Sequence, residues 1–158
     1  MLKRIVKLLL IVCWMIFIFS FSNDTGVVST KKSDGLIIRL VEVISNKELS
    51  DSEKEKWIKY LVVPVRKSAH LIVYLILGLL IYSFVREFLP GNLKAFLLSF
   101  ISSFIYACSD EVHQMFVSGR SGQVSDVFLD MIGVLFGIMI FKLIFERGKK
   151  YESKKRIS

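Results

Sequence analysis

The stretch VFLDMIGVLFGIMIFKLIF, residues 127–145, decides the fold. It runs for 19 residues in which only Asp130 and Lys142 are charged. About 20 predominantly apolar residues are enough to cross a bilayer as an α-helix. The other apolar runs of the chain are residues 5–21, 68–85 and 95–109. The sequence therefore predicts an all-α protein, a bundle of four transmembrane helices.

The composition agrees with a membrane protein. Of the 158 residues, 53% are hydrophobic, and the mean hydropathy of +0.55 is too apolar for an ordinary water-soluble domain. In such a chain the net charge of +8 indicates positioning against a membrane. We therefore expect membrane lipid as a partner and no nucleic acid. Cys13 and Cys108 both lie in apolar runs, with no metal-binding spacing and no reason to predict a disulfide.

The distribution of lysine and arginine predicts the orientation. Lys3 and Arg4 precede the first span and Lys7 lies in its first turn, Arg86 and Lys94 lie in the short second connection, and seven more basic residues occur from Lys142 onward, most of them in a basic tail, residues 146–158. The third connection has Arg120 alone. Because short cytoplasmic connections carry the excess of basic residues, both termini should be cytoplasmic. A cleaved signal peptide is the alternative interpretation of the first span.

The long first connection, residues 22–65, is amphipathic in two pieces. Apolar residues recur at helical spacing over residues 36–44, and residues 50–53 (SDSE) form a capping-box pattern that opens a second helix. We expect both helices to lie flat on the outer surface of the membrane. Proline is tolerated in the first turn of a helix, so Pro64 predicts that the second span begins directly after it.

Polar residues within the spans are the candidate functional groups, because charged side chains in the hydrocarbon region are costly and face inward or line a wet cavity. The candidates for ligand binding or for a polar network are Arg66, Lys67, His70, Tyr74, Asp110, Glu111, Gln114, Arg120, Asp126 and Asp130. In the predicted topology the basic and acidic groups meet at one depth, which predicts a polar cavity opening to the outer leaflet. The alternative is a buried lattice of ion pairs that only fixes helix register.

Periodicity also predicts how the helices pack. Polar residues between Ser99 and Gln114 share one stripe of the third span, so this helix should bury its polar face and expose its apolar one. Gly133 and Gly137 form a small-xxx-small surface in the fourth span, and we expect them, with Gly78, to serve helix packing.

The motifs resemble those of the VanZ-like family of bacterial membrane proteins. They are RKSAH at residues 66–70 followed by Tyr74 and Gly78, then SDEVHQMF at 109–116, Gly119-Arg120, Asp126 and Gly133, with a serine-bearing turn at residues 19–22. The resemblance covers most of the chain and implies a single domain, residues 1–158, in the bacterial plasma membrane. It also implies a role in the cell envelope and, as in the family's namesake, lowered sensitivity to teicoplanin. This chain has Asp130 where the family more often has asparagine.

Three classes of function remain open. The first is binding of an anionic or zwitterionic envelope precursor or lipid headgroup by the arginines and carboxylates. The second is an intramembrane enzyme with His70 as general base, or with Ser121 of a G-x-S-G string as nucleophile. The third is a structural partner protein, and an oligomer is compatible with the sequence. We expect no cofactor and no metal, since His70 and His113 are the only histidines and His113 lies about 100° around the helix from Gln114. A mixed Asp/Glu/His site is the alternative.

Overall fold

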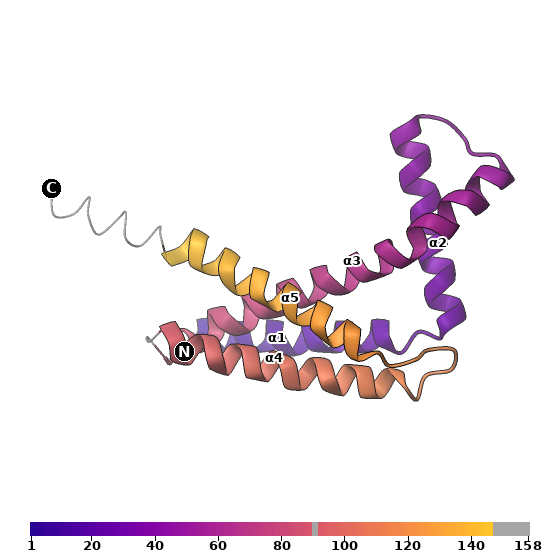
Figure 1. Ribbon diagram of the computed structural model, residues 1–158. Helices are drawn as coiled ribbons and strands as arrows, with labels where there is room; N and C mark the ends of the chain where they lie inside the picture. Colours follow the sequence, from indigo (N-terminus) through magenta and orange to yellow (C-terminus); the bar gives the residue numbers. More distant parts are fainter. Residues whose placement is uncertain (90–91, 147–158) are drawn as a thin grey trace, which may run out of the picture.

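The protein is all-helical, as predicted (Figure 1). The computed structural model describes residues 1–89 and 92–146. Over these residues the order is α1 (Leu2–Ser22), α2 (Gly26–Ser45), α3 (Asp51–Val85), α4 (Asn92–Gln114), α5 (Val124–Phe141) and a π-helical turn, η1 (Lys142–Glu146). Most of the predicted basic tail, residues 147–158, lies outside the described part of the chain.

Four of the described helices are long and apolar enough to cross a membrane. They are α1, α3, α4 and the continuous helix formed by α5 and η1, and they contain the four predicted apolar runs. The third span is longer than predicted, because α4 continues to Gln114. The polar residues of this last turn find partners inside the bundle, so the helix does not have to end where the apolar run ends.

α3 crosses the whole length of the bundle and corrects the prediction for Pro64. The helix starts at Asp51 and continues through the proline to Val85. Its start is fixed by the predicted capping box, in which the backbone N–H of Ser50 donates to Glu53 Oε2 at 2.9 Å. An interior proline removes one helical hydrogen bond, yet the helix continues, and α2 packs against α3. The second surface helix and the second span are therefore one helix.

α2 lies crosswise to α1 and α4 at one end of the bundle (Figure 1). Thr25 caps its N-terminus, and Asn46 ends it in the left-handed conformation with φ of 49°. Ile37 is buried against the rest of the chain, whereas Leu36 and Leu40 on the same apolar face stay about half exposed. This exposed apolar face is suited to contact with lipid.

α3 and α5 form the closest helix pair. A Cβ on Gly133 would meet the carbonyl of Leu71, and one on Gly137 would meet the carbonyl of Leu75. Gly78 lies against the backbone of Val134 in the same way. The three glycines thus let the two backbones approach each other, as expected for helix packing, and this small-residue surface is occupied within the chain.

α1 and α4 complete the core. The indole Nε1 of Trp14 donates to the carbonyl of Val73 at 2.9 Å, and the hydroxyl of Tyr106 donates to the carbonyl of Met15 at 2.6 Å. As predicted, α4 buries its polar stripe: Ser99 and Ser103 are fully buried, and each hydroxyl donates to a carbonyl one turn earlier. The apolar side chains on its other face remain exposed.

Candidate functional site

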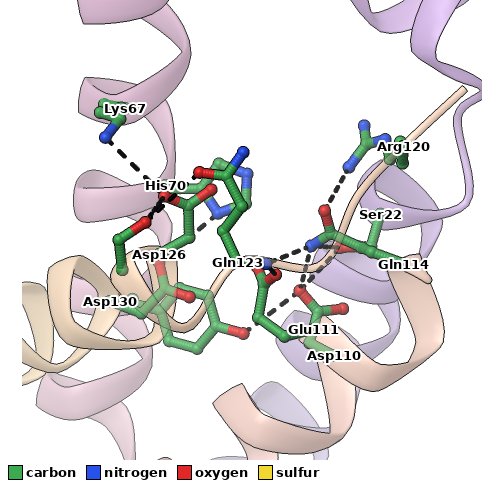
Figure 2. Close-up of polar contacts among 12 residues, drawn as sticks. Ser22, Lys67, His70, Asp110, Glu111, Gln114, Arg120, Gln123, Asp126 and Asp130 are labelled. Carbon is green, nitrogen blue, oxygen red and sulfur yellow. Dashed lines mark hydrogen bonds and ion pairs between the residues drawn. The ribbon is translucent and has the colours of Figure 1, made fainter.

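The candidate site lies at the end of the bundle where α1 and α4 end and α5 begins (Figure 2). The middle of α3 passes the same end and contributes Lys67 and His70. The last turn of α4 contributes two acidic residues and the first turns of α5 two more. Side chains that are far apart in sequence are therefore neighbours here, as the order of the spans predicts.

Asp110 is the centre of a buried hydrogen-bond network. Its Oδ2 accepts from the hydroxyl of Ser22 at 2.8 Å, from Nε2 of Gln114 at 3.1 Å and from the hydroxyl of Tyr74 at 3.3 Å. Only 2% of Asp110 is exposed. The carboxylate thus joins α1, α3 and α4, and the other oxygen, Oδ1, is buried without a hydrogen bond.

Arg120 closes this network from the connection between α4 and α5. Its Nη1 donates to Oε1 of Gln114 at 3.0 Å, and its Nη2 donates to the carbonyl of Phe21 at 3.0 Å. Burial lowers the pKa of the Arg120 guanidinium, and the like charge of Arg66 lowers it further, while nearby carboxylates oppose both effects. Arg120 therefore lies within electrostatic range of both Arg66 and the buried carboxylates.

His70, Glu111 and Asp130 form a second cluster beside the first. Nδ1 of His70 lies 3.4 Å from Oδ1 of Asp130, and one ligand-type atom from each of the three residues lies within 4.8 Å of the others. Glu111 is held by the backbone N–H of Gln123 at 2.9 Å and by Nε2 of Gln114 at 3.2 Å. These three side chains could hold a metal ion, and they come from three different helices.

The remaining candidates lie toward the surface. Lys67 reaches Oδ1 of Asp126 at 3.9 Å, where both side chains are partly exposed. Arg66 is exposed and donates to the hydroxyl of Thr30 on α2 at 3.2 Å. Among the described residues, neither Arg66 nor Arg120 forms an ion pair with a carboxylate. The expectation that all the basic groups meet the acidic ones therefore holds only for Lys67 and His70.

Two cavities open beside the site. One of about 480 Å³ lies between α1, α2 and α3, with Arg66, Arg120 and Lys32 among apolar walls. The other, of about 420 Å³, lies between α2, α3 and the start of α5 and includes Asp126. Arg66 and His70 line both cavities. They are the side chains through which an occupant of either cavity would contact the buried groups.

Sequence reasoning missed several groups that complete the site. Ser22 was placed only in a serine-bearing turn, and its bond to Asp110 was not foreseen. Thr30 and Lys32 lie on a helix that was expected to be a surface element. The N–H of Gln123 and the carbonyl of Phe21 are backbone groups, for which side-chain patterns give no signal.

Two candidates lie away from the site. The ring of His113 stacks on Phe19 with centroids 4.2 Å apart, and this histidine is not in the cluster of His70. Ser121 is exposed and accepts a weak hydrogen bond from Gln123 at 3.5 Å; within the described residues no histidine is bonded to it. The geometry gives Ser121 no activating base.

Comparison with known proteins gives a family. The sequence model of the family described as VanZ/LLP1 matches residues 7–145, which include all four spans and every residue of the site. No curated protein matches the chain. No solved structure matches it either.

Proposed function

Since the chain belongs to the VanZ/LLP1 family and has four helices suited to crossing a membrane, we propose that it binds the anionic or zwitterionic headgroup of a cell-envelope component at this polar site. The positive-inside pattern supports cytoplasmic termini, which would open the site to the outer side of the bacterial plasma membrane. Through this binding the protein would lower sensitivity to glycopeptide antibiotics of the teicoplanin type.

The observation that carries the proposal is the pair of arginines in one cavity. Arg66 and Arg120 both line the cavity of about 480 Å³, and neither forms a direct ion pair with a carboxylate among the described residues. Lys32 in the same cavity is paired with Asp24 at 2.7 Å. Planar guanidinium groups bind phosphate and carboxylate through two parallel hydrogen bonds. An anion between the arginines would also relieve the repulsion that lowers the pKa of Arg120.

The walls of the cavity support an amphiphilic ligand. Ile18 on α1, Leu36 on α2, and Ile72 and Val73 on α3 line it beside the charged groups. An acyl or isoprenoid chain could lie along these side chains while a phosphate contacts the arginines. A soluble anion would not use the apolar walls, so the features together favour a lipid or a lipid-linked precursor.

The binding test uses the full-length protein in detergent with phosphatidylglycerol as the probe and phosphatidylcholine as the neutral comparison. Native mass spectrometry would give the affinity of each lipid. We expect wild type to prefer phosphatidylglycerol, and Arg66→Gln and Arg120→Ala to bind it about 10-fold more weakly, since a hydrogen bond to a charged group contributes about 1.5–3 kcal/mol. The matched control is Arg39→Gln, which changes an exposed arginine of α2 outside both cavities. Equal binding by all four proteins, or no preference in wild type, would contradict the proposal.

The cellular test compares glycopeptide susceptibility of a host expressing wild type or variants at Arg66, His70, Asp110 and Arg120. Membrane levels are measured in parallel. On the binding proposal the Arg66 variant stays at wild-type level in the membrane and loses its effect on susceptibility. If the protein only maintained a lattice of ion pairs, the loss of effect would follow the loss of protein.

A second candidate function is an intramembrane enzyme, which one observation favours. His70 lines both cavities and contacts the fully buried Asp130, the arrangement expected of a general base whose orientation is fixed by a carboxylate. His70→Ala separates the two candidates. An enzyme would keep its affinity for phosphatidylglycerol and lose its effect on the host, whereas a binding protein would change both together.

A further inference from the structure

We propose that His70, Glu111 and Asp130 bind a divalent transition metal ion, best represented by Zn²⁺, beside the two cavities that His70 lines. One imidazole nitrogen and two carboxylates would supply three ligands, and the fourth position would remain open. The inference goes beyond the binding of an anionic headgroup and does not depend on it, because neither arginine belongs to the metal ligands.

The buried charge of Asp130 is the main evidence. Asp130 is fully buried, and neither of its carboxylate oxygens accepts a hydrogen bond. Nδ1 of His70 and Oδ1 of Asp110 are likewise buried without hydrogen bonds. Buried polar groups are normally satisfied, and a buried charge is paired or coordinates a metal. Nδ1 of His70 and Oδ1 of Asp130 lie 3.4 Å apart, within ion-pair distance if the imidazole is protonated, but without a hydrogen bond between them. Oδ2 of Asp130 has no partner among the described residues.

The geometry is close to that of a tetrahedral site. With bonds of about 2.0–2.2 Å, two ligands of tetrahedral zinc lie roughly 3.4 Å apart. The distance between His70 and Asp130 already has this value, and the most distant ligand atoms of the cluster are within 4.8 Å. Glu111 has three rotatable side-chain bonds, so a small rotation would bring its carboxylate to the ion.

The surroundings have the features of a metal site. Outer groups orient Glu111: the backbone N–H of Gln123 donates to Oε2 and Nε2 of Gln114 donates to Oε1. The ion could reach the cluster through the cavity of about 420 Å³, where His70 is part of the wall. The double positive charge of the metal ion would also compensate the negative charges of Glu111 and Asp130. Asp110 is a third carboxylate nearby.

The competing explanation is protonation without a metal ion: a protonated His70 pairs with Asp130, or the buried carboxylates share protons. Metal measurements on the full-length protein in detergent distinguish the two. The protein is stripped with a chelator, titrated with Zn²⁺, desalted and analysed for zinc by mass spectrometry, and the visible d–d absorption of Co²⁺ is recorded in a parallel sample. We expect about one ion per chain and the intense bands of a four-coordinate cobalt site.

Variants locate the ion. Asp130→Asn and Glu111→Gln should each weaken zinc binding at least about 100-fold, since losing even an outer-shell partner costs about 10- to 100-fold. Asp126→Asn is the control, because it changes a carboxylate one turn away on α5 that is not in the cluster. Circular dichroism and size exclusion check that each variant folds, and either ligand variant suffices if the other fails. Arg66→Gln should bind zinc like wild type even if it loses the anionic lipid.

Three results would overturn the inference. They are absence of zinc from folded wild type after titration, equal zinc in the ligand variants and Asp126→Asn, and a cobalt spectrum that is only that of the hydrated ion. None of these results bears on whether Arg66 and Arg120 bind a headgroup.

Discussion

Charged side chains are exposed and paired at one end of the bundle and buried at the other. At the end away from the candidate site, Arg4 and Lys7 of α1 both pair with Glu87 just after α3, at 3.3 and 2.5 Å, and all three groups are at the surface. At the site end, Asp110, Glu111 and Asp130 are at most 6% exposed, and two buried carboxylates keep oxygens without hydrogen bonds.

This difference distinguishes charges that hold two helices together from charges that form a candidate functional site. Surface ion pairs between helix ends can hold α1 against α3 at little cost, because water still solvates the charges. Burying three carboxylates is costly, and packing α4 against α5 does not require it. Among the described residues, the buried carboxylate oxygens of α4 and α5 that lack hydrogen bonds lie at the site end, and both proposed sites are there.

The largest effect on stability is expected from a substitution in the middle of the bundle, where glycines allow α3 and α5 to pack closely. Gly137→Ala would press a Cβ against the carbonyl of Leu75, and both backbones would have to move. We expect a loss of about 3 kcal/mol or more in the free energy of unfolding, measured by SDS titration in mixed micelles.

Gly35→Ala is the matched control for this change. Gly35 lies in α2, and a Cβ there meets nothing within 4 Å. The same substitution should stabilise the protein by roughly 0.5–1 kcal/mol through helix propensity. If Gly137→Ala and Gly35→Ala changed the free energy of unfolding equally, the close contact of α3 and α5 would not be important for the stability of the bundle.

The next effect is expected in the network of Asp110. Asp110→Ala leaves the hydroxyls of Ser22 and Tyr74 and the amide of Gln114 without their common acceptor. Because interhelical hydrogen bonds in membrane proteins contribute about 0.6 kcal/mol each on average, we expect a loss of about 2 kcal/mol in the same SDS titration. Ser109→Ala, at an exposed neighbour, should change stability little. A stable Asp110→Ala protein would mean that this carboxylate serves a ligand and not the bundle.

Much of the fold could be predicted from the sequence because it depends on periodicity. The apolar runs give the four spans, and the stripe on α4 gives the buried face, on which Ser99 and Ser103 are fully buried while Ile101 and Ile105 are exposed. The capping pattern at Ser50 marks the true start of α3. Each of these signals is local, and a local signal can be recognised without knowing what the helix packs against.

What could not be predicted depends on tertiary contacts. Pro64 has the local properties of a helix start, yet α3 continues through it and packs against α2. Arg66 was expected to meet acidic residues, but it donates to Thr30 and leaves Asp110 to Ser22 and Gln114. The backbone donor from Gln123 to Glu111 depends on how the loop after α4 returns. Residue types alone do not determine which of several polar partners is reached.

The smallest effect on stability is expected at the end away from the candidate site, where the ion pairs of Glu87 should make stability depend on pH. Hydrogen bonding to Lys7 is the main cause that lowers the pKa of Glu87 below its ordinary 4.5, and the attraction of Arg4 adds to it. A carboxyl group with a lowered folded-state pKa stabilises the fold above its ordinary pKa, and this stability is lost as the pH falls through the folded value. Glu87→Gln should therefore lower the thermal stability of the detergent-solubilised protein slightly at pH 7. The difference from wild type should begin to shrink as the pH falls below the ordinary pKa of 4.5 and vanish once the pH is below the lowered pKa of the folded state. It should also shrink in 1 M salt, which screens exposed pairs. A loss as large as that of Asp110→Ala, or one insensitive to salt, would show that charges at this end are as deeply involved in the fold as those at the site.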